Sequence, residues 1–329
     1  MADSIGNQDL PLGVEVRHLA ALEAIALTSS FSQAAAMLGY AQSAVSQQIA
    51  TLERAVGHKL VERPGGPRPV SLTSAGEVLL RHATHITARL GAAKADLDAL
   101  AAGDAGALRV GTFQSASARL LPPTLTLFRD NWPGITVELR NAAGRLLEGL
   151  VRAGQLDLAF TDVPTHADPL TATELIADPF VVMLPPDHPL AAGDEVDLAS
   201  LDGERFISGN SDDTCEFRVF EAIERFGGHP EVIFRSDDNL TKQRLVASGL
   251  GIAVVPLLAV ELFVPDAAVT VLPIAERQAI SRSIGIVWHK DRYRSRAAEA
   301  FVETAITIAR NISLPDIPVV TSRSTSMFV

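Results

Sequence analysis

The segment from Phe31 to Glu53 constrains the fold of this chain more than any other part of it. Its pattern predicts a short helix over 32–38, a tight turn at 39–41 and a second helix over 42–56. Apolar side chains would pack these helices together: Ala35, Leu38, Val45, Ile49 and Leu52. The second helix would expose amides and hydroxyls: Gln42, Ser43, Ser46, Gln47 and Gln48. Amides can pair bidentately with adenine and hydroxyls with several base edges, so the pattern is typical of a helix-turn-helix that reads the major groove.

The flanking residues extend this interpretation to a winged domain over 14–73. Residues 16–28 carry apolar side chains on one helical face, which predicts a first helix. Two short strands are predicted at 60–63 and 70–72, joined by the loop PGGPRP. The Pro and Gly content of this loop is expected to stiffen it. The loop would then carry Arg68 outward, into a minor groove or onto a phosphate.

A long helix is predicted over 74–102, within a linker that extends to residue 106. Thr73 or Ser74 would be its N-cap, with Glu77 as the capping-box partner. Apolar residues recur in the helix at alternating spacings of four and three: Leu79, Ala83, Ile86, Leu90, Ala93, Leu97 and Leu100. This a/d pattern favours a dimerisation helix. The alternative is a surface helix that packs on its own domain.

From residue 107 the pattern changes to alternating strands and helices. Strands are predicted first at 108–113, 135–140 and 156–160, then at FVVMLP, EVIFR, GIAVVP, VTVL and SIGIVW, before a last helix over 296–312. This alternation predicts an α/β domain long enough for two lobes. We expect one lobe at 107–166 with 291–312, and the other at 167–290.

The net charge of −11 is unevenly distributed. Between Phe31 and Val70 the charge is +2, whereas from Ala107 onward 20 basic and 29 acidic residues give −9. The positive excess lies where phosphate contacts would be needed, but it is weak. Useful affinity for DNA would therefore require a dimer.

Cysteine use and the two termini indicate a cytoplasmic protein. Cys215 is the one cysteine, so no intrachain disulfide can form, and a buried structural role is favoured over a redox switch. The N-terminus lacks the pattern of a signal peptide and is predicted to be a flexible arm over 1–13. The composition of 313–329 predicts a disordered tail. His82 and His85 have no third ligand near them in sequence, so we expect them to be surface residues rather than part of a metal site. We also expect no cofactor.

The chain resembles the LysR-type transcriptional regulators. The N-terminal match is FSQAAAMLGYAQSAVSQQIATLERAVGHKLVER followed by LTSAGE, and LRVGTFQSASARLLP, VRAGQLDLAF and LVASGLGIAVVP follow in the order of that family. The resemblance covers about 16–312. It implies a winged helix-turn-helix, a dimerising linker helix and a two-lobed domain like the type II periplasmic binding proteins. Three departures are Leu60-Val61 in place of Leu-Phe, Gln47 where many members have Arg, and the Pro- and Gly-rich wing.

The resemblance implies double-stranded promoter DNA, a small polar metabolite and further copies of the chain as partners, the last as a dimer of dimers, and it allows a contact with RNA polymerase. For DNA we assign Gln42, Ser43, Ser46 and Gln47 to base edges, and Ser32, Arg63 and Arg68 to the backbone. For the effector cleft, the matching positions are Thr112, Ser115, Thr161, Ser208, Gly209 and Asn210. For dimerisation they are Leu79, Ile86, Leu90 and Leu97.

The chemistry of the effector is open at this point. Ser115 would precede a helix near Leu120, where its hydroxyl and unpaired amides suit an anion, although each such residue could equally be an ordinary cap or turn. Gly144 stands where some family members have a hydroxyl residue, so one anchor would be missing. Four acidic residues would instead favour a cationic or neutral effector, or would form solvated loops: Asp212, Asp213, Asp237 and Asp238.

Two other classes of protein are disfavoured. An enzyme would need a catalytic constellation, and the sequence has no Gly-x-Ser-x-Gly elbow, no Walker A loop and no Cys/His set at metal-ligand spacing. A solute-binding protein would share the predicted C-terminal fold but would carry a signal peptide rather than a helix-turn-helix.

Overall fold

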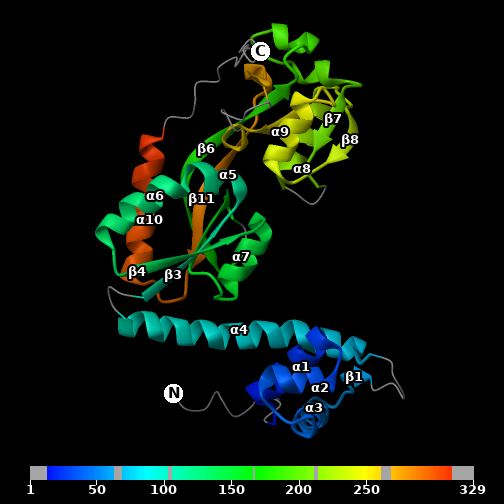
Figure 1. The fold of residues 1–329 in the computed structure, drawn as a ribbon, viewed down its shortest axis with the longest axis vertical. Coiled ribbons are helices and arrows are strands. Elements are labelled where there is room, and N and C mark those ends of the chain that lie inside the picture. The colour runs from blue at the N-terminus through cyan, green and yellow to red at the C-terminus, as the bar shows by residue number, and fades with distance from the viewer. Residues whose placement is uncertain are drawn as a thin grey trace, which may run out of the picture. The chain divides into compact units, whose positions relative to one another are not determined.

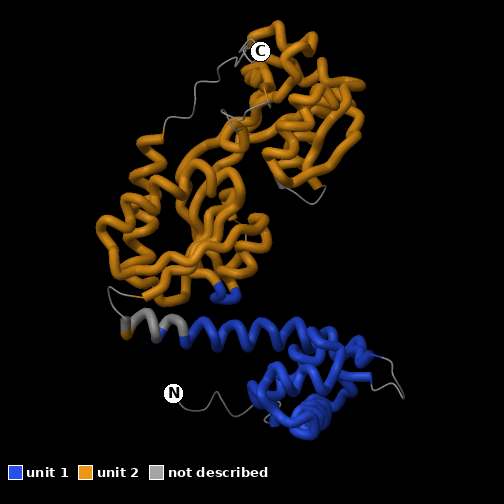
Figure 2. Tube along the Cα trace, in the orientation of Figure 1, with its two compact units in different colours: residues 1–97, 153–155 blue, residues 98–152, 156–329 orange. Residues whose placement is uncertain are grey.

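The computed structural model describes residues 13–62, 69–102, 106–165, 167–210, 214–260 and 268–312. The chain forms two compact units, residues 1–97 with 153–155 and residues 98–152 with 156–329 (Figure 2). Several predictions fall outside the described residues: the arm up to residue 12, the wing loop with Arg63 and Arg68, the acidic pair Asp212 and Asp213, and the tail over 313–329.

The first unit is built on α1 (Val16–Thr28), α2 (Phe31–Leu38) and α3 (Gln42–Val56) (Figure 1). Ser30 caps α2 by accepting a hydrogen bond from the Gln33 amide at 3.4 Å. The helix ends at Gly39, whose φ of 70° lies in the left-handed region that glycine adopts without strain. Val45 and Ile49 of α3 are fully buried against α1 and α2. The predicted helix-turn-helix is therefore confirmed.

A buried carboxylate fixes the chain that leaves α3. Glu53 accepts hydrogen bonds from the Leu60 amide at 2.9 Å, from the Val61 amide at 3.3 Å and from the Lys59 ammonium at 2.9 Å. Burial disfavours the charged form, but these donors outweigh it and keep the pKa of Glu53 below its ordinary value. The network positions the backbone of Leu60 and Val61 against the end of α3.

The wing strands and the long helix follow. The strands β1 (Val61–Glu62) and β2 (Ser71–Leu72) pair antiparallel, and α4 extends over Ser74–Ala102. Thr73 is the N-cap of α4, because its hydroxyl accepts a hydrogen bond from the Gly76 amide at 3.0 Å.

The apolar seam of α4 is divided between two environments. Ala83 is fully buried, and Leu79 packs against the core of α1–α3, so these two positions belong to their own domain rather than to an exposed seam. Ile86, Leu90 and Leu97 are 50%, 53% and 66% exposed. The first turns of α4 thus follow the alternative interpretation, and the dimerisation prediction now concerns only the exposed positions.

The second unit contains a seven-stranded mixed sheet in the order β10-β6-β11-β5-β3-β4, with β9 also paired to β6. Its strands are β3 (Gly106–Thr112), β4 (Ile135–Asn141), β5 (Leu158–Val163), β6 (Leu170–Leu184), β9 (Ala253–Pro256), β10 (Thr270–Pro273) and β11 (Ser281–His289). A second sheet pairs β7 (Arg205–Ser208) parallel to β8 (Glu231–Arg235).

The helices of the second unit lie against these sheets. They are α5 (Gln114–Arg119), α6 (Leu121–Asn131), α7 (Gly144–Arg152), α8 (Thr214–Arg225), α9 (Asn239–Ala247) and α10 (Arg296–Asn311), with short 3-10 turns at Pro189–Ala192, Leu198–Leu201, Leu257–Ala259 and Glu276–Gln278.

Separate apolar cores define two lobes that β6 and β11 join (Figure 1). The first lobe packs α5, α6, α7 and α10 around β3, β4 and β5, with Phe128, Phe160 and Phe301 in edge-to-face contact at its centre. The second lobe packs α8 and α9 around β7, β9 and β10. The predicted two-lobed α/β architecture is confirmed.

The structure corrects the predicted lobe boundaries. We expected residues 167–290 in the second lobe, but Leu170, Ile284 and Val287 lie in cores of the first lobe. Both β6 and β11 cross from one lobe to the other, and β6 begins well before the predicted strand at Phe180. The segment TATELIAD within β6 has few buried side chains, so its apolar signal is too weak to mark a strand.

Candidate functional site

The helix α3 presents amide and hydroxyl groups to solvent. Gln42, Ser43 and Gln47 are exposed, and Ser46 is half-buried. The first turn of α3 carries no acidic residue that would repel phosphate. Gln48 was predicted to be exposed, but it is half-buried and its Oε1 atom is enclosed. It lies at the edge of the helix face that buries Val45, Ile49 and Leu52.

An apolar groove of about 480 Å³ lies beside the exposed part of α4 in the first unit. The groove is lined by Val16, His85, Ile86, Arg89, Leu90 and Ala93. It therefore joins the exposed seam of α4 to the start of α1 in one apolar surface.

A buried guanidinium lies where the two lobes join. Arg282 of β11 donates to Asp178 of β6 at 2.9 and 2.8 Å, and the Asp178 carboxylate is 0% exposed. The other oxygen of Asp178 accepts a hydrogen bond from the Leu258 amide at 2.9 Å. Because β6 and β11 are the crossing strands, this ion pair locks them together at the junction.

Arg282 also contacts both lobes. It donates to the Ser115 hydroxyl of α5 at 2.7 Å, and its guanidinium lies 5.1 Å from the centre of the Phe113 ring. On the other side it lies 3.6 Å from the Cys215 sulfur of α8, with Asp162 of β5 at 3.7 Å. Burial disfavours the guanidinium charge, but Cys215, Asp178 and Asp162 hold the pKa of Arg282 above its ordinary value.

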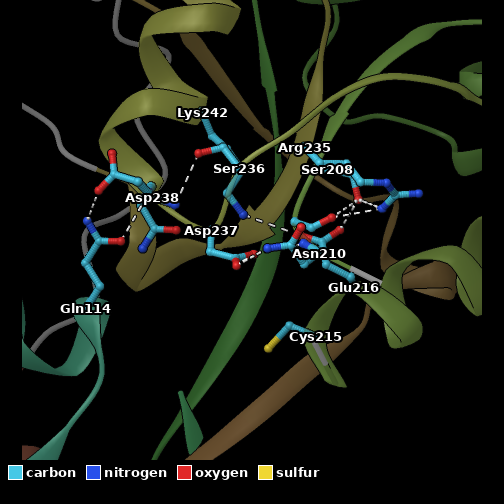
Figure 3. A network of polar contacts seen from close by, with 12 residues as sticks. Gln114, Ser208, Asn210, Cys215, Glu216, Arg235, Ser236, Asp237, Asp238 and Lys242 are labelled. Atoms are coloured by element: carbon cyan, nitrogen blue, oxygen red, sulfur yellow. Dashed lines mark hydrogen bonds and ion pairs between the residues drawn. The ribbon is translucent and has the colours of Figure 1, made fainter. Parts of the chain in front are cut away.

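A second buried network lies inside the second lobe (Figure 3). The Ser208 hydroxyl at the end of β7 donates to Glu216 of α8 at 2.8 Å, and the other oxygen of Glu216 lies 3.4 Å from the Lys242 ammonium of α9. All three side chains are buried. A Cβ atom at Gly209 would lie 2.6 Å from the Glu216 carboxylate, so only glycine leaves room for this arrangement.

Further polar contacts lie at the edge of the second lobe that meets Gln114 of the first lobe, which we call the rim (Figure 3). Asn210 donates through its backbone amide to Asp237 at 2.8 Å, and its side-chain amide also donates to that carboxylate. From the first lobe, Gln114 reaches Asp238 and the Asn239 amide at the start of α9, each at 2.9 Å.

Most of the predicted effector residues are enclosed. Thr112 and Ser208 end β3 and β7, as expected, but Thr161 lies inside β5 rather than after it, where it pairs with Gly285 of β11. The buried members are Thr112, Ser115, Thr161, Ser208 and Gly209, whereas Asn210 is exposed. Ser115 precedes α6, which begins at Leu121, as expected, but it lies within the first turn of the six-residue α5, and its hydroxyl accepts from Arg282. A Cβ atom at Gly144 would lie 3.1 Å from the Thr161 hydroxyl, so a larger residue there would crowd Thr161.

Sequence reasoning missed the charged residues that organise this region: Arg282, Asp178, Asp162, Glu216 and Lys242. Arg282, Asp178 and Asp162 are single charges in largely apolar stretches, which is a signal that could have marked them as buried ions. Glu216 and Lys242 lie among other charged residues and carry no such signal. Cys215 is half-buried against Asp162 at 3.5 Å. Within the described residues, no group of three or more His, Cys, Asp or Glu side chains could hold a metal ion, and no helix is long and apolar enough to cross a membrane.

These features define a class of protein: a DNA-binding helix-turn-helix joined by a long helix to a two-lobed α/β unit. Residues 16–77 match the family model described as bacterial regulatory helix-turn-helix protein, lysR family, and residues 101–309 match the LysR substrate binding domain. The chain belongs to the LysR family of transcriptional regulators.

Individual relatives agree with this assignment. The chain is 31% identical over 298 residues to the uncharacterized HTH-type transcriptional regulator YnfL of Escherichia coli, covering 88% of this chain and 97% of that one. It is 32% identical over 247 residues to the Hca operon transcriptional activator HcaR of the same organism, covering 74% and 82%. Full-length CbnR in complex with its target DNA shares the fold, with a TM-score of 0.67 over 90% of this chain and 100% of that one, at 22% identity.

Proposed function

We propose that this regulator reads promoter DNA with the exposed face of α3, as a dimer formed through α4, and that a small polar effector acts between the lobes of the second unit. The main support for this proposal is the exposed face of α3, where Gln42, Ser43 and Gln47 are open to solvent. The turn at Gly39 positions the start of this helix. A DNA-binding regulator would work in the cytoplasm.

The proposed contacts divide by chemistry. Gln42 and Gln47 suit the bidentate pairing that adenine offers, and Ser43 and Ser46 suit several base edges. Ser32 is exposed at the start of α2, where a phosphate would meet helix amides. Arg63 and Arg68 of the wing remain proposals from sequence alone.

The proposed dimer rests on the groove beside α4. Ile86, Leu90 and Leu97 are each at least half exposed, which leaves a row of large apolar side chains on α4 open to water. The spacing of the exposed positions fits a helix of a second copy. A dimer would double the weak positive excess of the DNA-binding segment and so raise affinity. A further association into a dimer of dimers, and a contact with RNA polymerase, are extensions of this proposal by family resemblance.

The effector proposal must account for hydroxyls that already have partners. Ser115 accepts from Arg282 and Ser208 donates to Glu216, so an effector that bound either hydroxyl would have to exchange for an internal contact. A small polar molecule with both donors and acceptors could make such exchanges. The buried charges are already paired, so nothing among the described residues requires an anionic effector rather than a neutral one.

Gln42→Ala should weaken binding to a preferred DNA site by about 1–3 kcal/mol, because the adenine-type contact is lost while the helix remains. Gel shifts with a preferred and a scrambled site measure the effect. Gln33→Ala, which removes an exposed amide from α2, is the matched control and should leave the ratio of the two affinities unchanged. Unchanged affinity in both Gln42→Ala and Gln47→Ala would reject α3 as the reading element.

A further inference from the structure

One side chain of the first lobe completes a helix of the second. Gln114 opens α5, which belongs to the first lobe because Ala116 and Leu120 lie in its core. Its amide nitrogen donates to Asp238 at 2.9 Å, and its amide oxygen accepts from the Asn239 backbone amide at 2.9 Å. Asp238 is the N-cap of α9 and Asn239 its first residue, and α9 packs in the second lobe (Figure 1).

The two contacts share the work of capping α9. The first amides of a helix have no partner inside the helix. One oxygen of Asp238 accepts from the Thr241 amide at 2.7 Å, which is the ordinary N-cap contact, and the other accepts from Gln114. The Asn239 amide is satisfied by Gln114. If the lobes separated, this amide and one oxygen of Asp238 would lose their partner together.

These contacts differ from those at the junction of the crossing strands. The Arg282–Asp178 pair is buried, so breaking it would leave a charge without water or a partner. Asp238 is exposed and Gln114 is half-buried, so water can replace their hydrogen bonds at small net cost. The unit therefore combines a fixed hinge at Arg282 with a closure at the rim that can open.

We propose that Gln114, Asp238 and Asn239 form a latch that sets the equilibrium between closed and open lobes. An effector that entered between the lobes would shift this equilibrium by competing with the latch or by adding to it. The influence of the latch on promoter control rests on the proposed function. Its influence on lobe opening does not.

Cys215 provides a measure of opening that involves none of the latch residues. It is the one cysteine of the chain, and its sulfur on α8 lies 3.5 Å from Asp162 on β5 of the first lobe. Separation of the lobes would expose this sulfur. The rate at which N-ethylmaleimide alkylates the full-length protein, without DNA or effector, therefore reports the open fraction.

The test is a series of substitutions at Gln114 that differ in charge. Gln114→Ala should raise the alkylation rate about 3–10-fold, since hydrogen bonds are lost. Gln114→Glu should raise it further, because its carboxylate would face Asp238. Gln114→Lys should give a rate between those of the wild type and Gln114→Ala, since its ammonium can pair with Asp238 but cannot accept from the Asn239 amide. Thr126→Ala, which removes a hydrogen bond within α6, is the control and should have no effect.

Equal alkylation rates throughout the series would overturn the latch. An alkylation rate for Gln114→Lys as high as that for Gln114→Ala would also overturn it. Either result would show that the pairing with Asp238 does not hold the lobes together. If the alkylation rates follow the predicted order but the protein does not bind DNA, the latch is supported and the proposed function is rejected. The two proposals can therefore be tested independently.

Discussion

Replacing Asp178 with Asn should lower the free energy of unfolding of the second unit by about 3–5 kcal/mol, because it leaves the Arg282 guanidinium buried without its main partner. The Asn oxygen can still accept from the Leu258 amide, so the loss isolates the ion pair. Both tryptophans, Trp132 and Trp288, lie in this unit, so urea unfolding followed by tryptophan fluorescence reports it selectively.

The double variant Asp178→Leu with Arg282→Met is the control for this prediction. It removes both charges and replaces them with apolar side chains of similar size, which often costs little in stability. We expect it to be more stable than Asp178→Asn alone. If Asp178→Asn unfolds at the same urea concentration as the wild type, the pair does not lock β6 to β11.

Leu90→Glu should weaken self-association by at least about a hundredfold, or roughly 3 kcal/mol, because a dimer through α4 would bury two like charges without partners. Leu90 is 53% exposed in the single chain, so the folded monomer should tolerate the change. Sedimentation velocity over a range of protein concentrations measures the loss.

Thr84→Glu is the matched control, since Thr84 is exposed on α4 but lies off the seam. It should sediment as the wild type does. If Leu90→Glu also keeps the wild-type oligomer, the exposed seam of α4 is not the contact between subunits, and the groove beside it requires another explanation.

Local signals account for the parts of the fold that the sequence predicted. The turn at Gly39 and the bounds of α3 depend on residues a few positions apart, and each was placed correctly. The cap of α4 was narrowed to Thr73 or Ser74, and the structure selects Thr73, so Glu77 is not at the capping-box position. The exposed amides at Gln42 and Gln47 follow from the 3.6-residue period of the same helix. Hence the exposed polar face of α3 was largely predictable from the sequence.

The region between the lobes was not visible in this way, because long-range pairing creates it. Arg282 meets Asp178 and Ser115 only because β11 and β6 cross between the lobes and α5 packs beside them, and more than a hundred residues separate Arg282 from either partner. Lys242 and Glu216 likewise meet only because α9 and α8 both pack against β7. No periodicity within one segment could reveal these pairs.

The most direct test of the account is selection of binding sites from a pool of random double-stranded DNA by the purified full-length protein. We predict enrichment of a sequence with two half-sites related by a dyad, with adenine at positions where Gln42→Ala loses its preference. A bound pool indistinguishable in sequence from the input would contradict the claim that this protein reads promoter DNA through α3.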